Sequence, residues 1–464
     1  MSALLGILIL VAPACDLSTI NVDPTRPADV DLRLILPALI TQTAYNQSSN
    51  PARISGIIMQ QMIGFDAQQV AYTDYQLPQN TFNNYWRTGT YAGALKDCQV
   101  IIDKATAEGQ PYYSGIAKVL MAENYGMLAA MFGDVPFSQA LKGTENLTPA
   151  YDSQEAVYAG VQALLDDAIN DLSQAEVAGG PAADDLIYSG DAAAWIGTAN
   201  ALKARYTMHL TKRNGATAAN AALALIENSA FSSAADQPNF LWSTVQTAAN
   251  PIALFGIQRP NTLVIDARFN AWMDGNSDPR LPFYMTTNGS EWQFYDAGAG
   301  LRWSSNDSPI PIISFTELSF LKAEALLWTG ADDATVQAAL EDAISASMAE
   351  VGVTDTAAID AYIADRADMS GLSGTDEKLE RIMEEAYVGL YGMAFQQVWT
   401  NYRRNGYPAL TPSASGSGGL NPSGVIPRRF LYPDSESTTN RENWEAAQAA
   451  QGGALLDADT WAFE

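Results

Sequence analysis

Positive charge is scarce in this chain. Lys and Arg together number 25 among 464 residues, against 52 Asp and Glu, and the formal net charge is −27. Proteins that bind nucleic acid or anionic membrane surfaces present basic patches to those partners. The charge balance therefore argues against both kinds of partner, and it predicts a well-solvated acidic exterior.

Histidine is almost absent. The single one, His209, lies in an apolar helical stretch, where a packed core residue is expected. One histidine excludes a zinc site that needs two, including the His-Glu-x-x-His helix of metalloproteases. The chain also lacks a Gly-x-Ser-x-Gly elbow and a dinucleotide-binding fingerprint after a strand. We therefore expect no enzyme: no catalytic residue, no metal and no cofactor.

Cysteine occurs only twice, in different contexts. Cys15 follows the apolar run 4–14, which is too short to span a bilayer but is typical of the central region of a signal peptide. The tail Ala12-Pro-Ala-Cys15 is similar to a bacterial lipobox, although Ala12 replaces the usual Leu and no Lys or Arg precedes Cys15. We expect residues 1–14 to be a lipoprotein signal peptide, Cys15 to be the lipidation site, and Cys98 to be an inert packing residue.

Helical spacing of apolar residues dominates the rest of the chain. The stretch 112–132 is apolar over most of a helix circumference, so neighbours must cover it on several sides. The stretch after Asp152, which we expect to open a capping box with Glu155, has a single apolar face. This alternation predicts an all-α solenoid of stacked, tetratricopeptide-like helical hairpins. Further helices are expected at 191–213, 216–229, 314–329, 332–351 and 376–403.

Two segments differ in kind from the helical regions. Residues 231–313 are rich in Pro, Asn, Gly and aromatic residues, and they predict loops, short helices and a small hairpin packed on the solenoid. Residues 405–464 are irregular and contain a Gly- and Ser-rich surface loop at 411–424. We expect one domain over residues 15–464, with the helical repeats at about 51–230 and 314–404.

Two Arg-Arg pairs stand near the C-terminus. Arg403 and Arg404 end a helix that a Gly-Tyr-Pro turn stops, and Arg428 and Arg429 follow Pro427. Because guanidinium groups suit planar bidentate partners, these pairs predict an ordered structural network with carboxylates and carbonyls. The same interpretation applies to charged residues on apolar helices, namely Lys203, Arg205, Lys322 and Glu324.

These C-terminal motifs, with other stretches in order along the chain, resemble the SusD/RagB family of outer-membrane nutrient-binding lipoproteins, in its SusD-like 2 branch. The other matching stretches are Trp86-x4-Tyr91, Gly133-Asp-Val-Pro136 followed by Tyr151-Asp152, Tyr188-x-Gly190-Asp191 with Trp195, Asp278-Pro-Arg280, and the helix from Glu317 to Ala325. The resemblance implies a helical protein on the cell surface, anchored to the outer membrane by lipid. It also implies a partner TonB-dependent (SusC-like) transporter, to which the protein delivers oligosaccharides or peptides.

Candidate ligand-binding residues come from two aromatic, non-helical places. Sugars lay the apolar faces of their rings on aromatic side chains, while amides, carboxylates and arginines take the hydroxyl groups. The first place supplies Tyr72 and Tyr75. The second supplies further aromatics and an arginine, namely Trp292, Tyr295, Arg302 and Trp303. The alternative is that these rings only pack the irregular segment.

Other interpretations stay open at this point. A helical-repeat scaffold that binds only protein would show the same helices, with its aromatic residues buried. A glycoside hydrolase needs two carboxylates that converge across a cleft, which a sequence with 52 acids does not exclude. Asp274-Gly-Asn276-Ser-Asp278 has the first oxygen spacings of a calcium loop, but Met285 stands where the loop needs Glu, so a simple turn is favoured.

Overall fold

The computed structural model describes residues 30–287, 289, 292–293 and 301–464, so the predicted signal peptide and Cys15 lie outside the described residues. The N-terminal helices are α1 (Leu32–Ser48), α2 (Asn50–Ile58), α3 (Gln68–Thr73), the π-helical η2 (Tyr85–Leu95), α4 (Lys96–Glu108), α5 (Pro111–Phe132), α6 (Gln154–Leu172), α7 (Ala192–Met208), α8 (Thr211–Asn214) and α9 (Ala216–Ser229). The later helices are α10 (Pro251–Gln258), α11 (Ala267–Gly275), α12 (Leu281–Tyr284), α13 (Phe315–Trp328), α14 (Asp333–Val351), α15 (Thr356–Arg366), α16 (Gly374–Gly389), α17 (Phe395–Asn405), α18 (Glu436–Thr439) and α19 (Arg441–Ala450). The predicted all-α class is confirmed.

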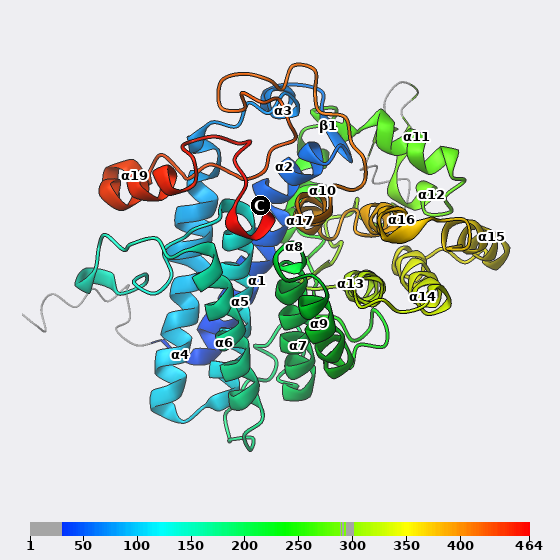
Figure 1. The fold of residues 1–464 in the computed structure, drawn as a ribbon. Helices are drawn as coiled ribbons and strands as arrows, with labels where there is room; N and C mark the ends of the chain where they lie inside the picture. Colours follow the sequence, from blue (N-terminus) through cyan, green and yellow to red (C-terminus); the bar gives the residue numbers. More distant parts are fainter. Residues whose placement is uncertain (1–29, 288, 290–291, 294–300) are drawn as a thin grey trace, which may run out of the picture.

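Consecutive helices pair as hairpins and stack on one another. The pairs α5–α6, α7–α9 and α13–α14 make the most extensive contacts, and α6 also packs on α7, as α9 does on α13 (Figure 1). Helix α5 is buried along nearly its whole length, as its apolar circumference predicts. At Gly126 of α5, an added Cβ would lie 2.1 Å from Cζ of Tyr206, so α7 approaches this helix at a position where only glycine fits. Tetratricopeptide-like stacking is thereby confirmed.

The interval 231–313 consists of short elements, as expected. Helices α10, α11 and α12 alternate with short antiparallel strand pairs. Strand β3 (Leu263–Ile265) pairs with β1 (Met62–Gly64), with Val264 opposite Ile63. The other pairs join β2 (Asn239–Phe240) to β6 (Ile310–Pro311), and β4 (Thr286–Thr287) to β5 (Trp292–Gln293). The first pairing connects the segment to a distant part of the chain, the second joins the two ends of the segment, and the third is the predicted small hairpin.

Three local expectations need correction. The single helix expected at 376–403 is two helices, α16 and α17, because Gly392 takes a φ of +80° between them. The N-cap of α6 is Ser153, whose hydroxyl accepts from the Ala156 amide; Asp152 instead accepts from the amides of residues 137 and 138. Lys322, which we expected to be a paired charge inside the solenoid, is exposed.

Buried ion pairs join helices that are far apart in sequence. The Arg205 guanidinium on α7 lies 2.6 Å from Glu317 on α13 and 3.0 Å from Glu123 on α5, with all three side chains at most 3% exposed. A second centre joins Arg280 to Asp278 and Glu385, and a third joins Arg404 to Glu324. Asp278, the last residue of the stretch with calcium-like spacing, therefore forms an ion pair with Arg280.

The C-terminal arginines form the predicted network. Arg403 donates to the backbone carbonyls of residues 130 and 428, and Arg429 donates to Gln451 and to the carbonyls of residues 453 and 455. Arg428 pairs with Asp459 at 2.6 Å. The irregular C-terminal segment is thus held against the ends of α5 and α17 by guanidinium groups.

His209 and Cys98 are core residues, as expected. The two ring nitrogens of His209 lie 2.9 Å from the Tyr158 hydroxyl and 2.9 Å from the Gln397 side-chain oxygen. The Cys98 thiol is buried and unoxidised, and burial raises its pKa well above the ordinary value. Over the part of the chain that the structure describes, no helix is both long enough and apolar enough to cross a membrane.

The Arg205 centre should contribute strongly to stability. Arg205→Met leaves Glu123 and Glu317 buried without a counter-charge, and we expect the free energy of unfolding to fall by about 3–5 kcal/mol. Urea denaturation measures this loss. The control, Arg441→Met, breaks the exposed Arg441–Glu445 pair and should cost less than about 1 kcal/mol. Equal losses in the two variants would contradict the role assigned to the Arg205 centre.

The buried histidine should make stability depend on pH. Burial, together with Arg404, lowers the pKa of His209 well below its usual 6.5. The unfolded chain takes up this proton as the pH falls through 6.5 and the folded chain does not, so the free energy of unfolding decreases on acidification. Between pH 7.5 and 5.5, the wild type should lose about 1.4 kcal/mol more than His209→Gln in urea denaturation. An identical pH dependence of the two proteins would refute this assignment.

Candidate functional site

The first predicted aromatic pair lies around α3, near the top of the molecule in Figure 1. The rings of Tyr72 and Tyr75 are only 3% and 4% exposed. The Tyr75 hydroxyl accepts a hydrogen bond from the Ser413 amide at 3.1 Å, and the Asp74 carboxylate accepts one from the Ser413 hydroxyl at 2.9 Å. The Gly- and Ser-rich segment is therefore tied to the end of α3.

Within the second predicted group, Arg302 and Trp303 are packed against other parts of the protein. Trp303 is 5% exposed, and its ring packs so closely on Gly392 that an added Cβ there would lie 2.3 Å from it. The Arg302 guanidinium lies over the Trp303 ring at 4.6 Å and pairs with Glu350 at 2.9 Å. Trp303 packs the irregular segment against the break between α16 and α17, and Arg302 joins it to the C-terminal end of α14.

The remaining two predicted residues are Trp292 and Tyr295. The backbone of Trp292 belongs to β5 and lies opposite Thr287, and β5 also lies near β3. Tyr295 lies outside the described residues. Their proposed contact with a ligand stays a prediction.

Two adjoining hollows open beside α3. One, which we call the loop hollow, has a volume of about 620 Å³ and lies between α3 with the turn after it and the segment 415–420. The other, which we call the arginine hollow, has a volume of about 960 Å³ and lies among α1, α2, α3, η2 and α10. Gln68 and Tyr72 line both hollows. The predicted pair Tyr72 and Tyr75 thus meets at one hollow, whereas Arg302 and Trp303 line neither.

The arginine hollow combines rings with hydrogen-bonding side chains. Tyr45 on α1 is 48% exposed, and Phe255 on α10 is nearly buried beneath two guanidinium groups. The polar lining consists of amides and hydroxyls rather than carboxylates; its members include Gln42, Asn50, Gln68, Asn80, Asn84, Thr81, Thr88 and Thr262. Among the described residues that line this hollow, the charged ones are Arg53 and Arg259.

This part of the site escaped sequence reasoning for a physical reason. Arg53 lies at the start of the stretch that we expected to form helical repeats, Tyr45 precedes that stretch, and Phe255 and Arg259 belong to an irregular interval. Their proximity depends on α10 being folded back over α1 and α2. The one signal available in the sequence is a tyrosine among the polar residues at the end of α1.

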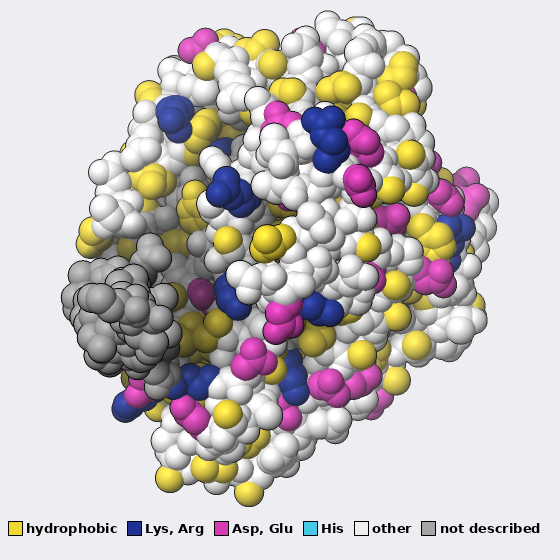
Figure 2. Space-filling model, turned by 90° about the vertical axis from the view of Figure 1, so that its left-hand side faces the viewer, with side chains coloured by type: hydrophobic (Ala, Val, Ile, Leu, Met, Phe, Trp, Pro, Cys, Tyr) yellow, Lys and Arg dark blue, Asp and Glu magenta, His cyan; other side chains and the backbone are white. Residues whose placement is uncertain are grey.

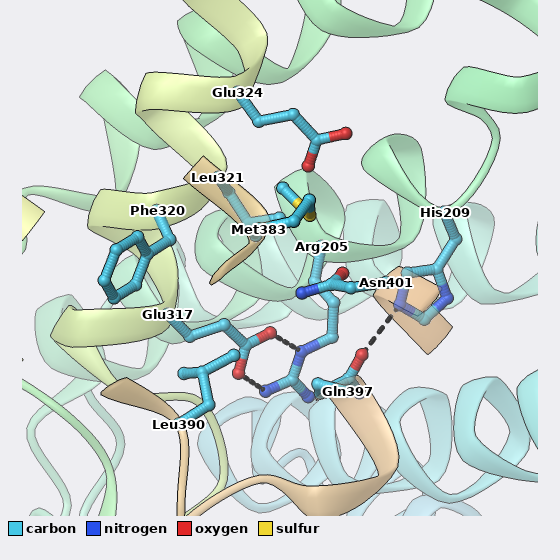
Figure 3. Close-up of a pocket in the computed structure, with 10 residues that line it drawn as sticks. All are labelled: Arg205, His209, Glu317, Phe320, Leu321, Glu324, Met383, Leu390, Gln397 and Asn401. Atoms are coloured by element: carbon cyan, nitrogen blue, oxygen red, sulfur yellow. Dashed lines mark hydrogen bonds and ion pairs between the residues drawn. The ribbon is translucent and has the colours of Figure 1, made fainter. Parts of the chain in front are cut away.

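A second polar space, inside the helical stack, is too small for a ligand. It has a volume of about 10 Å³ and lies among Arg205, His209, Glu317 and Glu324 (Figure 3). That volume holds at most a water molecule. The Arg205–Glu317 pair and the His209–Gln397 hydrogen bond occupy it, so this space belongs to the structural network.

Charges are dispersed on the face of the molecule shown in Figure 2. Figure 2 shows Lys and Arg side chains interspersed with Asp and Glu on the face that it displays, in small groups rather than in one basic patch. The arginine pair of the hollow is therefore a local departure from the acidic balance of the chain, whose net charge is −27.

The comparisons with known proteins bear on the whole fold. A SusD-like 2 family model, described as starch-binding associating with outer membrane, matches residues 24–433. A chitin-binding SusD homologue from Flavobacterium johnsoniae superposes with a TM-score of 0.79 at 22% identity, over 93% of this chain and 99% of that one. A SusD/RagB family protein from Bacteroides thetaiotaomicron gives a TM-score of 0.76 at 26% identity, over 94% and 99% of the two chains.

Another solved structure, named as a chitin-binding protein, gives a TM-score of 0.76 at 22% identity and covers 94% of this chain and 100% of its own. No curated protein matches. The family match spans most of the sequence, and the helical stacking agrees with it. The chain therefore belongs to the SusD-like 2 branch of the SusD/RagB family, whose members associate with the outer membrane.

Proposed function

We propose that this protein is a cell-surface lipoprotein that captures oligosaccharides in the arginine hollow and delivers them to a partner TonB-dependent transporter. The observation that carries the proposal is the hollow itself. It offers about 960 Å³ lined by an exposed tyrosine ring, amides and hydroxyls, in a chain of the SusD-like family. Its volume lies within the range of small-molecule sites.

The lining suits a sugar. The half-exposed Tyr45 ring supplies a flat apolar face of the kind on which a pyranose ring stacks. Amide groups around it both donate and accept hydrogen bonds, as hydroxyl groups do. Tyr72 forms part of the wall rather than an open platform, because its ring is almost fully buried. We therefore assign the role of platform at this hollow to Tyr45.

The predicted second platform remains part of the proposal. Trp292 and Tyr295 belong to the irregular segment, and Arg302 and Trp303 hold the start of the next stretch against Glu350 and Gly392. We propose that Trp292 and Tyr295 supply this second platform. A longer oligosaccharide would then contact both regions.

Binding without bond cleavage fits the hollow better than hydrolysis does. A glycoside hydrolase needs two carboxyl groups on either side of the scissile bond. The described residues that line the arginine hollow include two arginines and no Asp or Glu. The glycan is thus held by groups that have no acid or base to give to a glycosidic bond.

The surface location rests on sequence and family together. The family associates with the outer membrane. The lipobox-like Ala12-Pro-Ala-Cys15 supports anchoring through a lipid on Cys15. The TonB-dependent transporter and the alternative of peptide cargo come from the resemblance, and binding to a purified transporter would establish the partner.

The platform role of Tyr45 can be tested directly. Purified residues 16–464 should bind a polysaccharide in a panel that includes starch and chitin oligosaccharides. Tyr45→Ala should weaken that binding at least about tenfold in isothermal titration, which corresponds to about 1.4 kcal/mol of lost ring contact. The control is Tyr112→Ala, at the far end of α5, where the hydroxyl donates to the carbonyl of residue 174. Equal affinities of the two variants would exclude Tyr45 as the platform.

Membrane attachment should depend on Cys15. In cells, the wild type should partition into the membrane fraction, incorporate labelled palmitate and retain a TonB-dependent transporter on mild solubilisation. Cys15→Ser should lose the label and appear in the soluble fraction, because one thiol carries the anchor. Cys98→Ser is the matched control. A labelled Cys15→Ser protein in the membrane fraction would contradict the assignment of Cys15.

A further inference from the structure

The arginine hollow is electrostatically unlike the rest of the molecule. The chain has a net charge of −27, yet the charged side chains among the described residues lining this hollow are Arg53 and Arg259. Both guanidinium carbons lie close to the same ring, Phe255, at 4.3 Å and 5.1 Å from its centroid. Two positive charges are therefore gathered at one aromatic wall of the hollow.

Arg53 is only partly satisfied by the protein. Its one side-chain hydrogen bond within the described part of the chain is a 3.3 Å contact to the Asn50 side-chain oxygen, and its Nε is fully buried without a partner. Burial, together with Arg259, lowers the pKa of Arg53 to about 10. The group therefore keeps its charge at neutral pH, and none of the described carboxylates pairs with it.

Arginines that are fully buried have more partners than the half-buried Arg53. Arg205, Arg280 and Arg404 each pair with at least one buried carboxylate. Arg403 and Arg429 lack carboxylates but donate to several carbonyl or side-chain oxygens. A buried charge is costly unless it is paired and hydrogen-bonded. Arg53 is thus a cation whose compensation is missing from the described protein and whose side chain opens onto a large hollow.

We propose that the arginine hollow selects an acidic oligosaccharide, with the carboxylate of a uronic acid residue accepting hydrogen bonds from Arg53 and lying within the field of Arg259. The proposal rests on the proposed function, because it specifies the sugar that the same hollow takes. A planar carboxylate matches the two-pronged donor geometry of a guanidinium group. The Tyr45 ring and the surrounding amides hold the rest of the sugar, which favours a glycan over a simple anion.

The test compares ligands that differ only in charge. Oligogalacturonides, glucuronate-containing oligosaccharides and alginate oligosaccharides are titrated against residues 16–464, each beside its methyl ester, and starch and chitin oligosaccharides are titrated as neutral glycans. We expect one acidic ligand to bind at least about tenfold more tightly than its ester. Added salt should weaken the acidic ligand more than the ester, because screening acts on the charge interaction.

Substitutions of the two arginines test whether they cause the preference for the acidic ligand over its ester. Arg259→Gln is an exposed substitution, so the protein should fold, and it should reduce the acid-to-ester affinity ratio about tenfold. Arg53→Lys keeps the charge but removes the planar fork, and it should reduce the ratio as well. The control Arg441→Gln removes an exposed arginine of α19 and should leave the ratio unchanged.

The outcomes separate this inference from the proposed function. Binding of a neutral glycan that is lost in Tyr45→Ala, with no preference for any acid over its ester, would overturn the acidic specificity and keep the glycan-binding function. No binding of any glycan, acidic or neutral, would overturn both. An acid preference that Arg259→Gln and Arg53→Lys leave intact would place the selectivity elsewhere and overturn the role of this hollow.

Discussion

The helical stack buries several guanidinium groups, and the structure depends on carboxylates that neutralise them there. Arg205 joins α5, α7 and α13 through Glu123 and Glu317, which lie 82 and 112 residues away from it in sequence. Each charge would be costly alone in that environment, so displacement of α7, which carries Arg205, would leave both glutamates without a counter-charge. The Arg280 and Arg404 centres repeat the principle further along the stack. The packing of apolar faces brings the helices together, and these pairs determine which helix stands beside which.

The arginine hollow departs from this pattern of neutralised arginines. Arg205, Arg280 and Arg404 pair with buried carboxylates, whereas Arg53 has no carboxylate partner among the described residues. Its Nε is buried without a described partner, as the Nε of Arg404 also is. Desolvating a guanidinium group in this way is unfavourable for folding. In natural proteins, such locally unfavourable features are found at functional sites, where a bound ligand can offset them. Affinity at this hollow would therefore arise partly from relief of a cost already present in the free protein. The aromatic wall and the amides around it add shape and hydrogen bonds to that gain.

Much of the fold could be predicted from the sequence, because amphipathic spacing is a local property. The helices α5, α9, α13 and α14 begin and end within a residue or two of their expected bounds. The break between α16 and α17 could not be predicted, since it depends on Trp303, some ninety residues earlier, packing on Gly392. The site was harder for the same reason. Aromatic loop composition identified Tyr72 at the wall of the hollow, but Tyr45, Arg53 and Phe255 come together only through long-range packing. A half-buried arginine such as Arg53 leaves no pattern in the sequence that sets it apart from an exposed one.

The contact between Trp303 and Gly392 limits how the irregular interval could be deleted or transferred to another protein. The Trp303 ring fills the space beside Gly392 that an added Cβ would need, and β3 adds a partner to β1 near the beginning of the fold. The irregular interval is thus interwoven with both ends of the helical array. A deletion that removes it would not leave a shortened solenoid, and a transplanted copy would not carry its geometry into another helical scaffold. Exchanging ligand specificity between relatives would require moving helical and irregular parts together.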